Sequence, residues 1–98
     1  MQTPPAPKPA CGVFAFADVE AGPAPLKVLL TAEGDCTEGE VSFLWDFGDG
    51  SPPVSETTAV HTYEKPGNYK ARVHIESTTN PKLEDTDDVD IVVTPPQG

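Results

Sequence analysis

The stretch SFLWDFGDGSPP, residues 42–53, is the most informative part of this sequence about the fold. With the valine before it, this stretch places Val41, Phe43, Trp45 and Phe47 at every second position, which is typical of a β-strand with one buried face. Trp45 is the only tryptophan in the sequence, and we expect it to be the central aromatic residue of the core. The stretch therefore predicts a strand that runs into a turn.

The end of the stretch has the composition of a sharp reversal. Gly48 and Gly50 suit the positive φ angles that a tight turn needs, and Asp49 between them can accept a backbone N–H. Two aspartates this close together could instead form an acid/base pair. The alternation that leads into them favours turn and edge roles for Asp46 and Asp49.

The same period of two recurs along the chain, which predicts one buried face for each segment. The expected inward residues are Phe14 and Phe16; Leu26, Val28, Leu30 and Ala32; Tyr69, Ala71, Val73 and Ile75; and Val89, Ile91 and Val93. A weaker apolar segment at residues 59–63 could be a further strand. Segments rich in Gly, Pro, Asn and Asp separate these runs. Six or seven short strands predict an antiparallel β-sandwich of the all-β class.

The charge of the chain excludes several classes of partner. The 98 residues are enough for one domain and carry a net charge of −10, from 16 acidic and 6 basic residues. Nucleic acids require a positive surface, and this chain has no run of Lys or Arg, so we expect no nucleic acid partner. No stretch approaches the ~20 apolar residues that span a bilayer, so we expect no membrane insertion.

Proline-rich segments flank the alternating block. We expect a linker at residues 1–10, the folded domain at residues 11–94 and a second linker at residues 95–98. The first ten residues lack the apolar region of a secretory signal. We interpret the chain as one domain of a longer protein, with any export signal outside this segment.

Three quoted motifs carry a family resemblance. WDFGDGS (45–51), HTY (61–63) and KPGNYKARVHI (65–75) together resemble the PKD (polycystic kidney disease) domain family, and the resemblance runs from about Phe14 to Val93. The cysteines and the acidic segment AEGDCTEGE depart from the family pattern. The resemblance implies a seven-stranded, immunoglobulin-like sandwich, usually in extracellular or cell-surface proteins. The motif residues are Trp45, Asp46, Phe47, Gly48, Asp49, Gly50, His61, Tyr63, Gly67 and Tyr69.

The two cysteines are expected to form a disulfide. Cys11 lies just before the first expected strand, at residues 13–17, and Cys36 just after the second, at residues 26–32. If these strands run antiparallel side by side, both cysteines lie at the same end of the sandwich, within the ~5.5 Å between Cα atoms that a bridge prefers. An even cysteine count in an extracellular domain favours the bridge as well. Two unpaired thiols are the alternative, which gains weight if the strands lie in different sheets.

The sequence does not predict an enzyme. It has no recognisable nucleophile motif, and we expect His74 on the outer face of its strand and His61 on the face of Tyr63, bonded to a neighbouring turn. Two distant histidines and two cysteines 25 positions apart lack the spacing of a zinc site. We predict no metal and no cofactor.

Weak calcium binding is left open. Asp35, Glu38 and Glu40 share one loop, and a second acidic run extends over residues 84–90. Calcium needs six to eight converging oxygen atoms, and neither segment has the spacing of a known cage. The alternative for the second run is a solvated loop and an outer strand face that discourages edge pairing.

The expected function is non-catalytic. We interpret the chain as a monomeric interaction or spacer module of a larger secreted or cell-surface protein, with the periplasm as a further compartment. Its expected partners are neighbouring domains and a protein or glycan ligand. The alternative is an accessory module that targets a secreted hydrolase to a polysaccharide or protein substrate. Such a module needs exposed aromatic residues, and the inward assignment of most aromatic residues counts against it.

Overall fold

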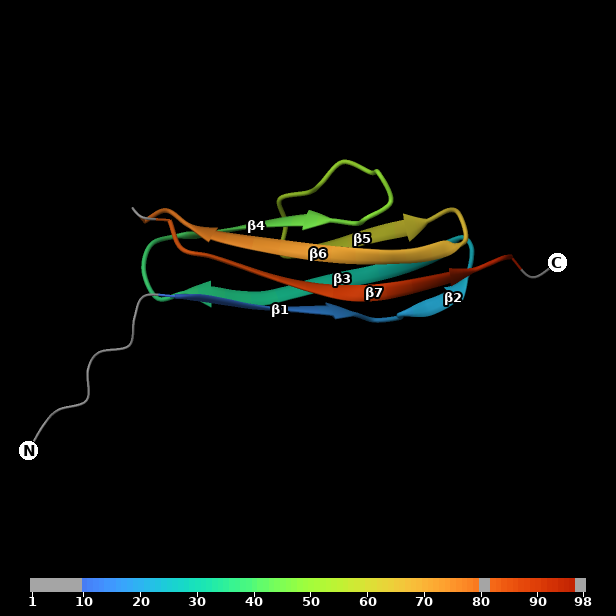
Figure 1. The fold of residues 1–98 in the computed structure, drawn as a ribbon, viewed down its shortest axis with the longest axis horizontal. Helices are drawn as coiled ribbons and strands as arrows, with labels where there is room; N and C mark the ends of the chain where they lie inside the picture. Colours follow the sequence, from blue (N-terminus) through green and yellow to red (C-terminus); the bar gives the residue numbers. More distant parts are fainter. Residues whose placement is uncertain (1–9, 80–81, 97–98) are drawn as a thin grey trace, which may run out of the picture.

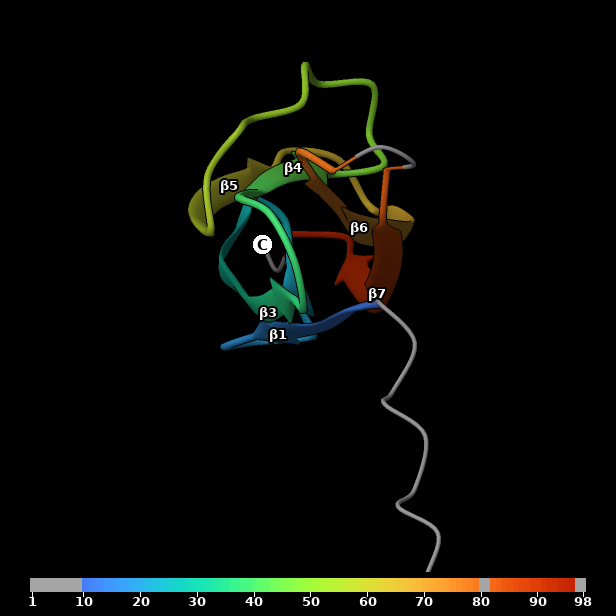
Figure 2. The ribbon, with the colours of Figure 1, turned by 90° about the vertical axis from the view of Figure 1, so that its left-hand side faces the viewer.

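The computed structural model describes residues 10–79 and 82–96, which form seven strands and no helix. The strands are β1 (Cys11–Ala17), β2 (Ala21–Pro23), β3 (Leu26–Cys36), β4 (Val41–Asp46), β5 (Thr58–Tyr63), β6 (Gly67–Ser77) and β7 (Glu84–Thr94). They build two layers, β1-β3-β5 and β2-β7-β6-β4 (Figures 1 and 2). The predicted all-β, seven-stranded sandwich is confirmed. The described part of the chain has no helix of the length and apolarity that a membrane span requires.

Strand pairing is antiparallel except at one short strand. The β1–β3, β3–β5, β4–β6 and β6–β7 ladders are antiparallel. In contrast, β2 pairs in parallel with the end of β7, from Ala21↔Val92 to Pro23↔Thr94. This short strand lies between the first two strands expected from the sequence, at residues 13–17 and 26–32, and was not predicted. The parallel pairing arises because β2 crosses to the other sheet while keeping the direction of β1, and β1 and β7 run the same way.

The core is built by the alternation that the sequence shows. Trp45 is fully buried and packs in one apolar cluster between the sheets. The expected inward residues of β3, β6 and β7 join it, and the buried members of the cluster from these strands are Val28, Leu30, Ala32, Ala71, Val73, Ile75, Val89, Ile91 and Val93. Val41 and Phe43 are half-buried and pack against the cluster. The burial predicted for these strands is confirmed.

The expectation for the first strand is wrong. Phe14 and Phe16 are 66% and 48% exposed, while Val13 is buried and Ala15 half-buried. Alternation fixes the period of a strand but not which of its two faces is buried. The inward residues Val13 and Ala15 are the ones whose N–H groups donate to Asp85 and Asp87 of β7.

The second of the expected strands, which is β3 in the structure, is longer than predicted. The predicted disulfide is confirmed. β3 runs through the acidic segment to Cys36 because residues 33–36 find backbone partners on β1, ending in the pair Cys11↔Cys36. These cysteines are bonded, with Cα atoms 4.0 Å apart. Thr37 N–H donates to the Ala10 carbonyl just beyond the bridge, at 2.9 Å. A cross-link over 25 positions contributes about 3.5 kcal/mol in the chain-entropy account.

Two carboxylates join the edge of one sheet to the other. Val13 N–H donates to Asp85 Oδ2 at 3.0 Å, and Ala15 N–H donates to Asp87 Oδ2 at 2.8 Å. Both aspartates lie on the side of β7 that also carries the buried Val89. Since residue 13 faces 85 and residue 15 faces 87, β1 and β7 run in the same direction. The chain therefore enters the sandwich at one end and leaves it at the other (Figure 1).

The expected linkers lie almost wholly beyond the residues that the structure describes. Residues 1–9 and 97–98 are outside that part of the chain, Ala10 is exposed, and Pro95 and Pro96 follow β7 as exposed residues outside any strand. The predicted domain boundaries stay a prediction.

Candidate functional site

The opening motif folds as a turn held by its own aspartates. Asp46 Oδ1 accepts the Gly48 N–H at 3.0 Å, and Asp49 Oδ1 accepts the Ser51 N–H at 3.0 Å. Gly48 and Gly50 have φ angles of +79° and +88°. Both aspartates are thus hydrogen-bond acceptors of the turn, as the sequence indicates.

Aromatic side chains connect the turn and the end of β4 to β5. Tyr63 is fully buried, and its hydroxyl donates to the Phe47 carbonyl at 2.8 Å. Burial raises the pKa of Tyr63, so the hydroxyl keeps its proton. The His61 ring stacks on Phe47, with ring centroids 4.0 Å apart. Trp45 Nε1–H donates to the Thr57 carbonyl at 3.3 Å. These contacts link β4 of one sheet to β5 of the other.

His61 bonds the turn, as expected. Its Nε2 lies 2.7 Å from Asp49 Oδ2. Burial raises the pKa of Asp49, but hydrogen bonds from His61 and Ser51 outweigh it, so this pKa lies below its usual 3.8. A catalytic triad would need the imidazole between the carboxylate and a hydroxyl. Here the carboxylate lies between Ser51 and His61, so the imidazole has no hydroxyl to activate in this cluster.

The last motif residues shape the start of β6. Gly67 is the first residue of the strand, and the Tyr69 ring packs at a tilt against Tyr63 with centroids 4.7 Å apart. The Tyr69 hydroxyl donates to the Lys65 carbonyl at 2.7 Å. The motif thus supports the connection from β5 to β6.

The acidic residues proposed for calcium do not converge. Among the described residues, no group of three metal-ligating side chains forms from Asp35, Glu38 and Glu40. The second run is not a solvated loop, because it is the first half of β7 and its side chains alternate between the two faces. Asp85 and Asp87 point inward, toward β1. At most weak calcium binding stays a prediction.

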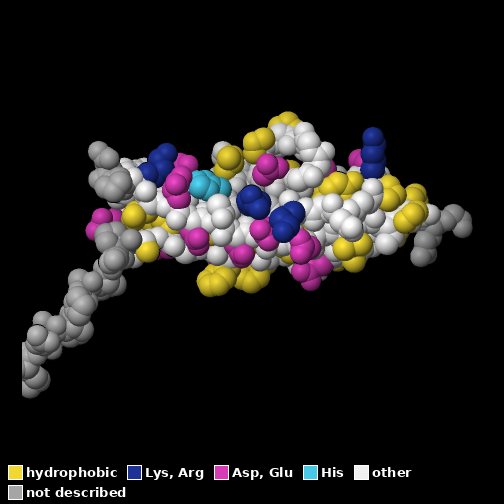
Figure 3. Space-filling model, in the orientation of Figure 1, with side chains coloured by type: hydrophobic (Ala, Val, Ile, Leu, Met, Phe, Trp, Pro, Cys, Tyr) yellow, Lys and Arg dark blue, Asp and Glu magenta, His cyan; other side chains and the backbone are white. Residues whose placement is uncertain are grey.

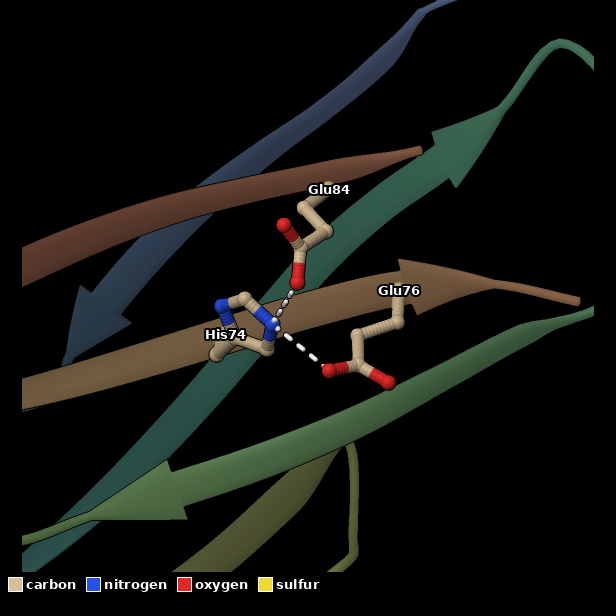
Figure 4. Close-up of side chains that lie close together, drawn as sticks. All are labelled: His74, Glu76 and Glu84. Atoms are coloured by element: carbon tan, nitrogen blue, oxygen red, sulfur yellow. Dashed lines mark hydrogen bonds and ion pairs between the residues drawn. The ribbon is translucent and has the colours of Figure 1, made fainter. Parts of the chain in front are cut away.

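One cluster of metal-ligating groups does form, on the outer face of β6 and β7. His74 Nε2 lies 3.1 Å from Glu76 Oε1 and 3.3 Å from Glu84 Oε1 (Figure 4). Lys82 Nζ lies 3.2 Å from the other oxygen of Glu76. The hydrogen bonds from Lys82 and, second, from His74 hold the pKa of Glu76 below its usual range.

Glu76 was not predicted from the sequence as a site residue. Two signals could have found it. Residues two apart on a strand share a face, which places His74 and Glu76 together. An acidic residue on the opposing strand of the hairpin, Glu84, then completes the group, but only the register Glu76↔Glu84 shows this.

The outer face of β1-β3-β5 carries exposed apolar side chains. Phe14 and Phe16 stand on this face of β1, opposite Glu33 and Thr31 of β3. Leu29 and Val60, which are 39% and 57% exposed, are directly paired across β3 and β5. In Figure 3, hydrophobic side chains project from the lower edge of the molecule, beneath the position of β1 in Figure 1. Because Phe14 and Phe16 are exposed, their expected burial no longer counts against a ligand-binding surface on this face.

The fold and the motif agree with a comparison of sequences. A sequence model of the PKD domain matches residues 13–93. The chain belongs to the PKD domain family. The family resemblance drawn from the three motifs is thereby confirmed, including the segment from residue 45 to residue 75.

Individual proteins similar to this PKD domain come from different settings. Human polycystin-1 is 43% identical over 44 residues, which are 43% of this chain and 1% of polycystin-1. The PKD1 domain from the Vibrio cholerae metalloprotease PrtV has a TM-score of 0.70 and 26% identity, covering 86% of this chain and 96% of that domain. A structure of carbohydrate-binding modules from the β-sandwich superfamily has a TM-score of 0.77 and 24% identity, covering 91% of this chain and 36% of that one, and shows the shared fold.

We predict that Gly48→Ala destabilises this PKD domain more than Gly50→Ala. Both positions have positive φ, where a Cβ costs about 1–2 kcal/mol. At Gly48 the new Cβ would also collide with the carbonyl oxygen of Lys70, whereas nothing lies within 4 Å of one at Gly50. Urea denaturation should show a loss of about 1 kcal/mol for Gly50→Ala and about 3 kcal/mol or more for Gly48→Ala. Equal losses would contradict this packing of the turn.

We predict that Asp49 contributes stability that disappears in acid. Its folded pKa lies below its unfolded pKa, so the ionised carboxylate stabilises the fold above the unfolded pKa, and this contribution is lost as the pH falls through the folded pKa. Free energies of unfolding of wild type and Asp49→Asn should therefore approach each other between about pH 5 and pH 2. The exposed acid Glu56 supplies the control, Glu56→Gln. A constant gap between wild type and Asp49→Asn across this range would show the prediction to be wrong.

Proposed function

We propose that this PKD domain is a non-catalytic spacer in a larger secreted or cell-surface protein. The observation that carries the proposal is the parallel course of the first and last strands. Val13 faces Asp85 and Ala15 faces Asp87, so the entry and exit of the chain lie at opposite ends of the sandwich (Figure 1). A domain of this kind separates its neighbours instead of bringing them together.

Rigidity between the two ends supports the spacer function. The β6–β7 ladder extends over nearly the full length of the domain, from Glu76↔Glu84 to Gly67↔Val93. At about 3.3 Å per residue, the 11 residues of β7 span roughly 35 Å. The disulfide fixes the entry end, where Cys11 begins β1. Neighbouring domains would therefore be held apart at a defined distance.

An extracellular location is part of the proposal. Disulfides persist in oxidising compartments, and the Cys11–Cys36 bridge fits such an environment. The net charge of −10 favours solubility and disfavours nucleic acid partners. The partners of the spacer are the neighbouring domains of its own chain, and the spacer itself acts as a monomer.

The spacer proposal predicts a fixed distance between two flanking domains. A fusion with one reporter domain at each end of the chain should give a single narrow distance distribution by pulsed dipolar spectroscopy. Replacing residues 11–94 with a Gly/Ser segment of equal length should broaden the distribution, since such segments behave as flexible coils. Equally broad distributions for the two fusions would contradict a spacer function.

A second candidate function is supported by the exposed aromatic residues. Phe14 and Phe16 stand two positions apart on β1 and are exposed on the same face of the strand, where both rings can stack against a ligand. With both rings exposed, the face could bind an insoluble polysaccharide and so target a hydrolase in the same parent protein.

The second candidate predicts binding that depends on the two rings. In cosedimentation with cellulose and with chitin, the double variant Phe14→Ser/Phe16→Ser should lose at least about tenfold in affinity, because each buried ring contributes about 1.5 kcal/mol or more. Val92, exposed in the other sheet, provides the matched control Val92→Ser. Absence of wild-type binding to both polysaccharides, or equal loss in the control, would exclude this function for the face.

A further inference from the structure

The outer face of the β6–β7 ladder has pairs of opposite charge at one part of the ladder and a pair of like charge at another. Lys70 pairs with Asp90 and Arg72 with Asp88, and the charged groups of these pairs approach to 3.8 and 3.7 Å. Further along the ladder, Glu76 stands directly opposite Glu84. Like charges that face each other across two strands destabilise a sheet. A positive group near the two carboxylates relieves this repulsion, and Lys82 supplies one at Glu76 Oε2.

His74 supplies a nitrogen ligand beside this pair, because a metal ion can replace the Nε2 proton that His74 otherwise donates to Glu76. Its Nε2 lies 3.1 Å from Glu76 Oε1 and 3.3 Å from Glu84 Oε1, and all three atoms lie within 4.8 Å of one another. In Figure 4 the imidazole and both carboxylates point toward one another. A tetrahedral metal with bonds of about 2.1 Å separates its ligand atoms by about 3.4 Å, close to the two measured distances.

We propose that His74, Glu76 and Glu84 bind one zinc-class divalent transition metal ion on this face. One imidazole nitrogen and two carboxylate oxygens are ligands that zinc accepts, and three protein ligands leave a fourth position open. Calcium fits poorly, because it takes six to eight oxygen ligands. The side chains of His74, Glu76 and Glu84 are 31%, 34% and 52% exposed, so the ion reaches them from solvent.

Lys82 orients one ligand without occupying the site. Its Nζ lies near Glu76 Oε2, which leaves Oε1 turned toward His74. The neighbouring outer-face charges are already paired, since Arg72 faces Asp88 on the adjacent positions. The three ligands therefore form a local group in which a bound cation relieves the repulsion between the two glutamates.

Zinc titration of the disulfide-intact chain tests the site. Isothermal titration with zinc chloride should show one ion per chain. Glu84→Gln should weaken binding at least about 100-fold, since the loss of a residue that only supports a metal ligand already costs 10–100-fold. Asp90→Asn is the matched control, because it removes one acidic charge from the same face of β7, and it should change affinity by less than about threefold.

A second readout identifies the ligand nitrogen and protects the test from folding effects. Zinc should shift the imidazole NMR signals of His74 and leave those of the partly buried His61 in place, and metal-free Glu84→Gln should keep the wild-type circular dichroism spectrum. Three results would each overturn the proposal: no binding of zinc, equal weakening by Glu84→Gln and Asp90→Asn, or calcium chloride binding as tightly as zinc chloride.

Discussion

The hydrogen bond from the Tyr63 hydroxyl to the Phe47 carbonyl is the contact on which one side of this sandwich depends. The tyrosine belongs to β5 and the carbonyl follows β4, so the bond joins the two sheets inside the core. A buried carbonyl without a partner costs about 1–3 kcal/mol, which makes the position of the turn after β4 a consequence of this bond. With the turn so placed, Asp49 reaches His61 and the imidazole lies flat on Phe47.

On the opposite side of the sandwich, hydrogen bonds from backbone N–H groups to carboxylates join the two sheets. There the edge of β1 has no further strand beside it, and Asp85 and Asp87 of β7 accept two of its backbone N–H groups. Backbone N–H groups that are already bonded to carboxylates are not available for pairing with a strand of another chain. These bonds therefore reduce the tendency of this edge to aggregate. The two bonds join residues 13 and 15 of β1 to residues 85 and 87 of β7, two strands that run in the same direction, so the ends of the domain lie apart (Figure 1).

The sequence was sufficient where alternation coincided with a large buried residue or a specific turn. The three motifs at residues 45–51, 61–63 and 65–75 together indicated the family, and the cysteine positions indicated the bridge. Alternation could not choose the buried face of β1, because both faces of this strand carry apolar residues. Val13 is buried and Phe14 is exposed, although phenylalanine is the larger apolar residue. The partner of the Val13 N–H, Asp85, belongs to a strand far away in the sequence.

Register was the other information that the sequence lacked. The polar end of β3 reads as a loop until its pairing with β1 is known. The acidic run in β7 reads as a solvated surface, although alternate side chains in it bond to β1 and pair with β6. His74, Glu76 and Glu84 become one group only through the pairing of two strands.

Asp85 and Asp87 of β7 hold the outer edge of β1, in addition to the β1–β3 ladder and the Cys11–Cys36 bridge. Amide hydrogen exchange measured by NMR, in wild type and in the double variant Asp85→Ala/Asp87→Ala, tests this role of the two aspartates most directly. We expect slow exchange at Val13 and Ala15 in wild type and fast exchange at both in the variant, with the β6–β7 ladder still protected. Fast exchange at Val13 and Ala15 in the wild-type domain would contradict it.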